Sequence, residues 1–326
     1  MPQLTLAAFP SPATLGDAGY AATSAAHCRA LEDGCILYVE RTPLDWTPQA
    51  LAVLRGHDDT AGSHKNIAYR CADDQLVGVR RGGTDVDALR SLLRTYAQRM
   101  TELLARLLLP YATDWRVDLT SFRPREEAGR RLPRRARNDL LHLDAFPARP
   151  TNGDRILRVF TNVHPTRPRC WMTTDTFDTL LPRFVDRPGN SLALPHQHSP
   201  WHWIRRWLLR HAPSGFAPLL RRSPYDAFML RFHDRLKADA HFQATTPVAT
   251  WEFPPGSSWI AFTDFVPHAA RAGQFALEQT FFVPRTSLLQ PEKAPISILE
   301  RRCGATLADP IQREAANDRP AAAVRG

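Results

Sequence analysis

The motif best suited to chemistry is a His-x-Asp pair in the middle of the chain, within the run Leu141-His-Leu-Asp-Ala-Phe-Pro147. Because side chains alternate across a β-strand, a strand over Leu140 to Phe146 places His142 and Asp144 on one face and leucines on the other. One imidazole and one carboxylate on one face are two ligands of the facial triad, which holds non-heme Fe(II) and leaves three coordination positions open. The run therefore predicts a metal site that needs one further histidine.

A candidate for the third ligand is His268, which follows the apolar run Trp259 to Phe265. That run comes after a Pro-Pro-Gly turn signal, and a second turn at Ala272-Gly273 precedes the last apolar run. In a jelly roll, segments this far apart in sequence can meet at one end of the barrel, and His268 would then join His142 and Asp144. The alternative for His268 is a buried or capping histidine.

Arg158 is a charged residue inside the apolar run Arg155 to Val163. A buried arginine needs an anionic partner, and its guanidinium group matches a carboxylate such as the distal carboxylate of 2-oxoglutarate. An internal ion pair with Asp or Glu is the alternative. Arg155 and Arg271 are further candidates for the same role.

Two other histidine patterns resemble metal motifs. His57-Asp-Asp59 also fits His-x-Asp, but the surrounding Gly, Thr and Ala residues indicate a polar turn. The histidines of His196-Gln-His198 and His202 have a spacing that can bind a divalent metal in a cupin. The prolines on both sides of this group favour a surface loop.

The elements that would position these residues are mostly short strands. Strand-like runs bounded by Pro, Gly, Asp or Asn occur at Cys35–Glu40, Asn66–Cys71, Trp115–Phe122, Leu140–Phe146, Ile156–Val163, Arg169–Thr174, Thr250–Phe253, Trp259–Phe265 and Ala276–Val283. A helix is predicted over Thr84 to Leu109, where leucines recur at helical spacing, Thr84 supplies an N-cap signal and Pro110 follows. Many short strands with such punctuation indicate a sandwich or a jelly roll.

The predicted fold class is α+β with a β-dominated core, a double-stranded β-helix (jelly roll) that carries an N-terminal α/β region and a helical insertion. We expect an N-terminal α/β accessory region over residues 1–113 and a jelly-roll catalytic core over 114–288, with the insertion at about 199–243. Helical signals within the insertion lie at Trp201–His211 and Asp226–Phe242. A C-terminal tail over 289–326 would follow, and its Ala-, Arg- and Asp-rich end is predicted to be disordered.

Composition narrows the class of protein. The chain has 42 basic and 33 acidic residues, a net charge of +9 and a pI near 9.8, which suggests anionic partners. Its five cysteines are scattered without a Cys-x-x-Cys pair, which excludes a disulfide framework or a zinc knuckle and fits a reducing compartment. Because no apolar run approaches membrane-spanning length and the first residues do not resemble a signal peptide, we expect a cytoplasmic protein.

Two basic segments are candidates for meeting an anionic, lipid-anchored partner. The first, Arg123 to Arg137, precedes the His-x-Asp pair and has a solvated loop as its alternative. The second, Trp201 to Arg222, interleaves Trp and Leu with Arg, and no acidic residue occurs between Asp186 and Asp226. This composition suits a helix in a membrane interface or a helix docked on its own domain. It would also suit RNA, but no recognition motif supports that, and we expect no nucleic-acid partner.

The sequence around the candidate ligands resembles that of the bacterial Kdo hydroxylases, where Kdo is 3-deoxy-D-manno-octulosonic acid. The similar runs are His142-Leu-Asp-Ala-Phe-Pro147, Arg155-Ile-Leu-Arg-Val-Phe-Thr-Asn162, and Phe253-Pro-Pro-Gly-Ser-Ser-Trp-Ile-Ala-Phe-Thr-Asp264 followed by His268. The resemblance covers roughly Trp115 to Pro284, and we expect the N-terminal part to belong to the same family, although no motif there is diagnostic. The chain departs from the wider superfamily about ten residues after the distal histidine, where many members have Arg and this chain has Glu278 and Gln279.

The resemblance implies an Fe(II)- and 2-oxoglutarate-dependent dioxygenase that uses O2 to hydroxylate C3 of Kdo in Kdo-lipid A, the lipopolysaccharide precursor, giving the sugar acid Ko. It implies His142, Asp144 and His268 as metal ligands, and Arg158 and Asn162 as residues that bind 2-oxoglutarate. It also implies a peripheral protein on the inner face of the inner membrane. The alternatives are a 2-oxoglutarate-dependent hydroxylase with a protein or small-molecule substrate, or a non-enzymatic basic protein that binds membrane or nucleic acid.

Overall fold

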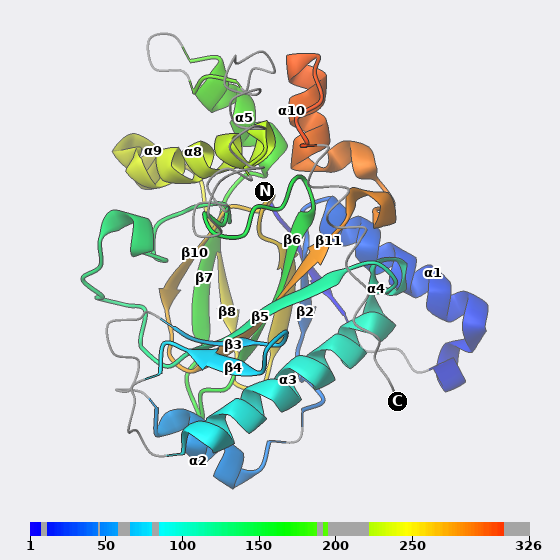
Figure 1. The fold of residues 1–326 in the computed structure, drawn as a ribbon, viewed down its shortest axis with the longest axis vertical. Coiled ribbons are helices and arrows are strands. Elements are labelled where there is room, and N and C mark those ends of the chain that lie inside the picture. Colours follow the sequence, from blue (N-terminus) through cyan, green and yellow to red (C-terminus); the bar gives the residue numbers. More distant parts are fainter. Residues whose placement is uncertain are drawn as a thin grey trace, which may run out of the picture.

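The computed structural model describes residues 1–7, 12–44, 46–57, 66–79, 85–187, 192–194 and 222–309. In the described part, a large and a small β-sheet face each other, helices cover the outside of the large sheet, and a second group of helices lies across one end of the strands (Figure 1). The cavity that holds the candidate ligands lies between these parts.

The large sheet has eight strands in the order β1-β2-β9-β6-β11-β5-β3-β4. Their bounds are β1 (Leu4–Leu6), β2 (Ile36–Val39), β3 (Ile67–Arg70), β4 (Gln75–Val77), β5 (Arg116–Arg123), β6 (Arg155–Asn162), β9 (Ser258–Phe262) and β11 (Ala276–Val283). Only β1 and β2 pair in parallel; the other neighbours are antiparallel. Four strands of the N-terminal region thus extend the sheet of the core on both sides.

The small sheet has the order β10-β7-β8, with β7 at Arg169–Thr173, β8 at Ala249–Phe253 and β10 at His268–Ala272. Aromatic residues from both sheets pack together: Phe160 and Trp259 from the large sheet meet Trp171 and Phe253 from the small sheet. Two antiparallel sheets packed in this way form the jelly roll that the strand pattern predicted.

The period of two along β6 separates the two sides of the large sheet. Leu157 and Val159 belong to the core shared with the helices, whereas Arg158 and Phe160 line the cavity between the sheets. The outer face is covered by α1 (Pro12–Glu32), α3 (Val86–Leu107) and α4 (Leu109–Ala112), with α2 (Pro48–Arg55) beside α3. Because β6 is buried on both faces, the charge of Arg158 has to be neutralised inside the barrel.

The helix predicted at Thr84–Leu109 is α3, and its apolar stripe is buried as expected. The side chain that caps its N-terminus is Asp85, which accepts from the backbone N–H of Ala88 at 3.2 Å. The helix ends before Pro110 because proline cannot continue the backbone hydrogen bonding. Its role is to support the sheet from outside.

The insertion contains α8 (Pro224–Ala238) and α9 (Ala240–Thr245), which lie across one end of the barrel (Figure 1). A capping box between Ser223 and Asp226 starts α8. Asp226 also accepts from the backbone N–H groups of Thr151 and Asn152 at 2.8 and 3.2 Å. One carboxylate therefore fixes the start of α8 to the loop before β6.

One predicted strand is absent from the structure, and two other predictions concern residues that the structure does not describe. The stretch Leu140–Phe146 was expected to be a strand, and this is wrong: only His142 makes an isolated bridge there. The helical signal at Trp201–His211 and the tail end after residue 309 lie outside the described residues. The remaining elements are α5 (Phe177–Val185), α10 (Pro295–Cys303) and the short 3-10 turns η1 (Arg134–Ala136), η3 (Arg285–Ser287) and η4 (Pro291–Lys293). The division at residues 113 and 288 stays a prediction.

Candidate active site

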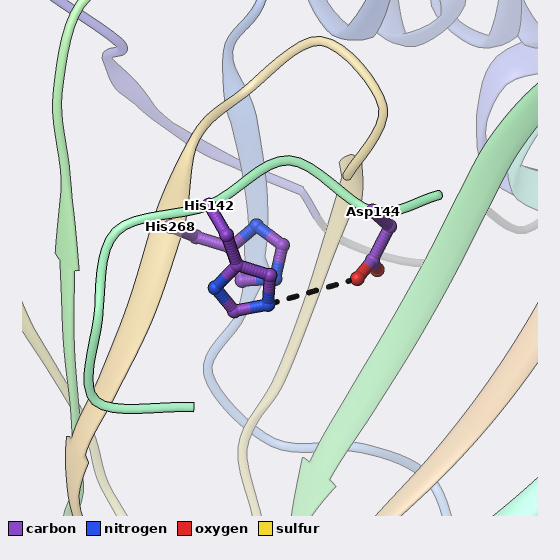
Figure 2. A group of neighbouring side chains, drawn as sticks. All are labelled: His142, Asp144 and His268. Carbon is purple, nitrogen blue, oxygen red and sulfur yellow. Dashed lines mark ion pairs between the residues drawn. The ribbon is translucent and has the colours of Figure 1, made fainter. Parts of the chain in front are cut away.

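His142, Asp144 and His268 come together in the barrel (Figure 2), and all three are buried. Their ligand atoms lie within 4.8 Å of one another, and the two imidazole centroids are also 4.8 Å apart. Nε2 of His142 is 3.8 Å from Oδ1 of Asp144. Among the described residues, this is the group of His, Cys, Asp and Glu side chains compact enough to hold a metal ion.

His268 is positioned by a regular strand. It is the first residue of β10 and pairs with Thr173 of β7, so a turn separates it from the apolar strand that it was expected to end. The ring of Trp171 stacks on the His268 ring at 4.8 Å and 15°. Backbone bonds of 3.1 and 2.9 Å between His142 and His268 then bring the His-x-Asp segment to the edge of the small sheet.

The segment Leu141 to Asp144 has no strand of its own, and its backbone is held by different parts of the chain. The side-chain amide of Gln243 donates to the Leu141 carbonyl at 2.9 Å and accepts from the Leu141 N–H at 3.0 Å. Nδ1 of His233 donates to the Leu143 carbonyl at 2.6 Å, and the Asp144 N–H donates to the Thr263 carbonyl at 2.8 Å. The helices α8 and α9 thus hold two candidate metal ligands through the leucines beside them.

The protonation states suit metal binding. Nδ1 of His142 donates to the Leu140 carbonyl at 2.7 Å and Nδ1 of His268 donates to the Val266 carbonyl at 3.0 Å, which leaves each Nε2 as the acceptor atom. Burial lowers the pKa of His142 well below its usual value, helped by the nearby His268. Burial likewise lowers the pKa of His268 to about 4. Both imidazoles are therefore neutral at pH 7.

Asp144 is the ionised member of the group. Burial by itself would raise its pKa, but the Arg158 guanidinium opposes this effect, and the pKa is held well below the usual range. Arg158 bonds Oδ2 of Asp144 through Nη1 and pairs with Glu278 through Nη2. Glu278 in turn accepts from Nε of Arg123 at 2.8 Å. One carboxylate oxygen of Asp144 is thus held by an arginine while the other faces His142.

Of the residues predicted to bind 2-oxoglutarate, only Arg158 lines the cavity. Arg158 lines the cavity, but it already makes the internal ion pairs that were its alternative reading. The side-chain amide of Asn162 donates to the Phe253 and Arg167 carbonyls, at 2.9 Å each, and does not line the cavity. Arg155 pairs with Asp264 and also lies outside the cavity, and Arg271 is exposed on β10. Arg158 is therefore the member of this set that the structure brings beside the triad.

The cavity around the triad has a volume of about 440 Å³ and is partly open to solvent. Its walls carry more cations than anions. The basic residues are Arg123, Arg135, Arg149, Arg158, Arg169 and Lys237, and the acidic ones are Asp144, Asp234 and Glu278. A cavity of this size and charge fits a small dicarboxylate together with part of an acidic substrate.

The donor set itself fits Fe(II). Two neutral imidazoles and one carboxylate are the donors of a facial triad. The cavity that these residues line has room for other molecules at the remaining coordination positions. Backbone carbonyls orient both imidazoles and an arginine orients the carboxylate, which is the usual support around a bound metal.

Comparison with known proteins places the chain. The family model for 3-deoxy-D-manno-oct-2-ulosonic acid (Kdo) hydroxylase matches residues 15–306. The chain belongs to the Kdo hydroxylase family. The resemblance read from the sequence is thereby confirmed, and the match extends into the N-terminal region, where no motif was diagnostic. A search of curated proteins found no match.

Solved structures agree with the family. The chain is similar to the Kdo hydroxylase KdoO, a non-heme Fe(II) α-ketoglutarate-dependent dioxygenase, in complex with cobalt(II): 32% identity, 94% of this chain and 98% of that chain covered, TM-score 0.77. KdoO in complex with α-ketoglutarate and Fe(III) gives 32% identity, coverages of 94% and 97%, and a TM-score of 0.76. The predicted jelly-roll fold class is confirmed by this similarity.

Several residues of the site were missed by sequence reasoning. His233, Lys237 and Gln243 lie on the helices of the insertion, and Glu278 was noted only as a departure from the superfamily pattern. No local motif identifies these residues. The partners of His233 and Gln243, for example, are 90 or more residues away along the chain. His196, His198 and His202 of the cupin alternative lie outside the described residues.

Proposed function

We propose that this Kdo hydroxylase acts on C3 of Kdo in Kdo-lipid A and produces Ko, with 2-oxoglutarate and O2 as co-substrates. The observation that carries the proposal is the buried His142, Asp144 and His268 triad in a chain of this family. In the overall reaction, one C–H bond becomes C–OH while 2-oxoglutarate and O2 become succinate and CO2. Atoms and electrons balance without a further reductant.

His142, Asp144 and His268 would hold the iron, through the two Nε2 atoms and one carboxylate oxygen. Bound Fe(II) supplies the redox chemistry that couples oxidation of 2-oxoglutarate to oxidation of the sugar. The chain provides neutral imidazoles and an ionised carboxylate at pH 7, so that no ligand has to lose a proton to the solvent before iron binds.

Arg158 is proposed to do two things at this site. It orients Asp144 through Oδ2, and its position in the cavity wall makes it the best-placed predicted contact for a carboxylate of 2-oxoglutarate. Because Glu278 also binds Arg158 and Arg123, a bound dicarboxylate would share or replace part of this ion-pair network. Asn162 has no part in the proposal, since its amide is used by the turn after β6.

The remaining work of the chain is to orient the sugar and exclude water. Leu230, His233 and Lys237 of α8 line the cavity together with Phe160 and Trp171 of the barrel. A sugar between these walls would present one C–H bond toward the triad. Fixing reactants in this way reduces the entropy cost of reaction and limits unproductive oxidation.

A lipid-anchored substrate requires the open end of the cavity to reach a membrane surface, and we propose peripheral binding at the inner face of the inner membrane. Support comes from the net charge of +9 and from Arg135 at the cavity edge, whose side chain is 84% exposed. Among described residues, no helix has the length and apolar character to span a bilayer. Vesicles with increasing anionic lipid should bind the protein in a salt-sensitive manner.

The function is tested with the purified protein, Fe(II), 2-oxoglutarate and Kdo-lipid A. Mass spectrometry should find one added oxygen on the Kdo unit, and succinate should form in equal amount. NMR of the released sugar should place the new hydroxyl at C3. Substrate-triggered succinate formation with peptides or water-soluble metabolites, but none with Kdo-lipid A, would contradict the proposal.

A further inference from the structure

Lys237 is a buried cation on the wall of the active-site cavity. The residue is only 5% exposed and it lies on α8, four residues after His233, whose ring meets the His142 ring edge-on at 5.2 Å. Residues four apart on a helix share a face, so Lys237 and His233 point to the same side of α8. Both line the cavity that contains the triad.

The charge of Lys237 has no carboxylate within ion-pair distance among the residues that the structure describes. Its Nζ donates to the backbone carbonyl of Arg135 at 3.0 Å. An ammonium group has three N–H donors, so this bond leaves two. Burial lowers the pKa of Lys237 to about 8, although the more distant Asp144, Asp234 and Asp139 favour the charged form.

The other cavity cations differ from Lys237, because each has a carboxylate of the chain beside it. Arg123 pairs with Glu278, Arg149 with Asp118, Arg158 with Asp144 and Glu278, Arg169 with Glu127, and Arg135 with Asp234. Among the described cations of the cavity, Lys237 is therefore the one without an ion pair to a carboxylate of the chain, and it is available to an anion that enters the cavity.

The chemistry of the substrate provides such an anion. In a 3-deoxy-oct-2-ulosonic acid, the carboxylate carbon is C1 and the carbon to be hydroxylated is C3, two bonds away. Any pose that brings C3 to the triad brings the carboxylate into the same cavity. Resting on the proposed function, we infer that Lys237 binds the C1 carboxylate of the Kdo residue and thereby selects an acidic sugar and orients C3 toward the triad.

The position of Lys237 favours the sugar over 2-oxoglutarate as its ligand. The ammonium group bonds to the carbonyl of Arg135, and the Arg135 side chain is 84% exposed at the edge of the cavity. Arg158 and Arg123 lie on β6 and β5, two strands of the barrel, whereas Lys237 lies on α8, the helix across one end of the barrel. A large lipid-linked substrate enters from the exposed edge, whereas a small co-substrate can occupy the interior.

The test compares Kdo-lipid A with its C1 carboxamide, using wild type, Lys237→Gln and Lys237→Met. Gln retains a neutral donor for the Arg135 carbonyl and removes the charge, whereas Met removes both. For wild type, kcat/KM should fall roughly 10- to 100-fold from acid to amide, the value of a charge-assisted bond. Both variants should lose a similar factor with the acid, and replacing the acid by the amide should then cost them less than about threefold.

Two controls separate this inference from other outcomes. Lys293→Met removes an exposed lysine that pairs with Asp33 far from the cavity, and it should retain the wild-type preference for the acid. Co(II) binding and the KM for 2-oxoglutarate should remain unchanged in Lys237→Gln. Retained acid preference in Lys237→Gln, or a raised KM for 2-oxoglutarate with that preference intact, would overturn the inference. Absence of wild-type activity on Kdo-lipid A would instead reject the proposed function itself.

Discussion

The two segments that carry the proposed metal ligands are built differently. His268 begins β10, a strand that pairs with β7 on both sides of a bulge at Arg271, and Trp171 of β7 stacks on its ring. His142 and Asp144 lie on a segment without regular strand pairing, and the side chains of Gln243 and His233 bond the leucines beside them. His268 is thus placed by a backbone ladder, whereas His142 and Asp144 have a few backbone bonds to the barrel and additional support from helices of the insertion.

This difference teaches where the site is sensitive. A ladder distributes support over many backbone bonds, so that one side-chain change alters it little. The His-x-Asp segment has only a few backbone bonds, and the backbone groups of Leu141 and the Leu143 carbonyl depend on side chains whose removal would leave them without a partner. We expect mutations around His142 and Asp144 to affect metal binding more than mutations around His268.

The largest expected effects come from the ligands themselves. Asp144→Ala and His268→Ala should each reduce hydroxylation by at least about 1000-fold, because three ligands are the minimum for this triad. Co(II) titration followed by visible absorption should show no specific binding. Circular dichroism should show a retained fold. A variant of either residue with full activity would refute the triad.

Gln243→Leu tests the support of the irregular segment. Loss of both amide bonds frees the backbone of Leu141 and should weaken Co(II) affinity roughly 10- to 100-fold, the usual effect of removing an outer group that orients a ligand. The matched control is Gln290→Leu, which changes a glutamine whose side-chain amide donates to Asp33. Equal affinities in the two variants would show that the amide does not position the ligands.

Arg158→Gln tests the arginine behind Asp144. Because Arg158 holds Oδ2 of Asp144 and lines the cavity, the variant should need roughly tenfold more Fe(II) and also more 2-oxoglutarate for half-maximal activity. Separate titrations of the two compounds measure the two effects. An unchanged 2-oxoglutarate requirement would assign its carboxylate to another cation of the cavity.

Trp171→Leu tests the ladder side of the comparison. Removing the stacked ring should weaken Co(II) affinity only about two- to tenfold, the value of an aromatic contact, because β10 remains paired with β7. Isothermal titration would measure this difference against Gln243→Leu. A loss larger than that of Gln243→Leu would reverse the proposed ranking of the two segments.

The smallest effect concerns the stability of the metal-free protein below pH 7. His142 and His268 have lowered pKa values in the fold, so the unfolded chain takes up protons first as the pH falls from about 6.5 toward about 4. Stability should therefore fall with decreasing pH, by under about 1 kcal/mol per buried histidine between pH 7 and 6. Thermal unfolding at several pH values measures it. A flat profile down to pH 5 would contradict the neutral, buried state.

Sequence by itself determined the chemistry and much of the secondary structure. The His-x-Asp pair, the distal histidine and the sequence motifs around them were enough to predict the triad and the family. Ligand types and strand periodicity are local properties that can be recognised from residues close together in the sequence. The strands β2, β3, β5 to β9 and β11 and the helix α3 could be predicted for the same reason.

Tertiary structure decided what surrounds the triad. Sequence reasoning expected a regular strand at Leu140–Phe146, but the fold instead supports that segment with Gln243 and His233 from helices about 100 residues later. It also pairs Arg158 with Asp144 and Glu278, takes Asn162 away from the cavity and brings Lys237 into it. These outcomes depend on which distant side chains share a buried space, and no local pattern of residues encodes that.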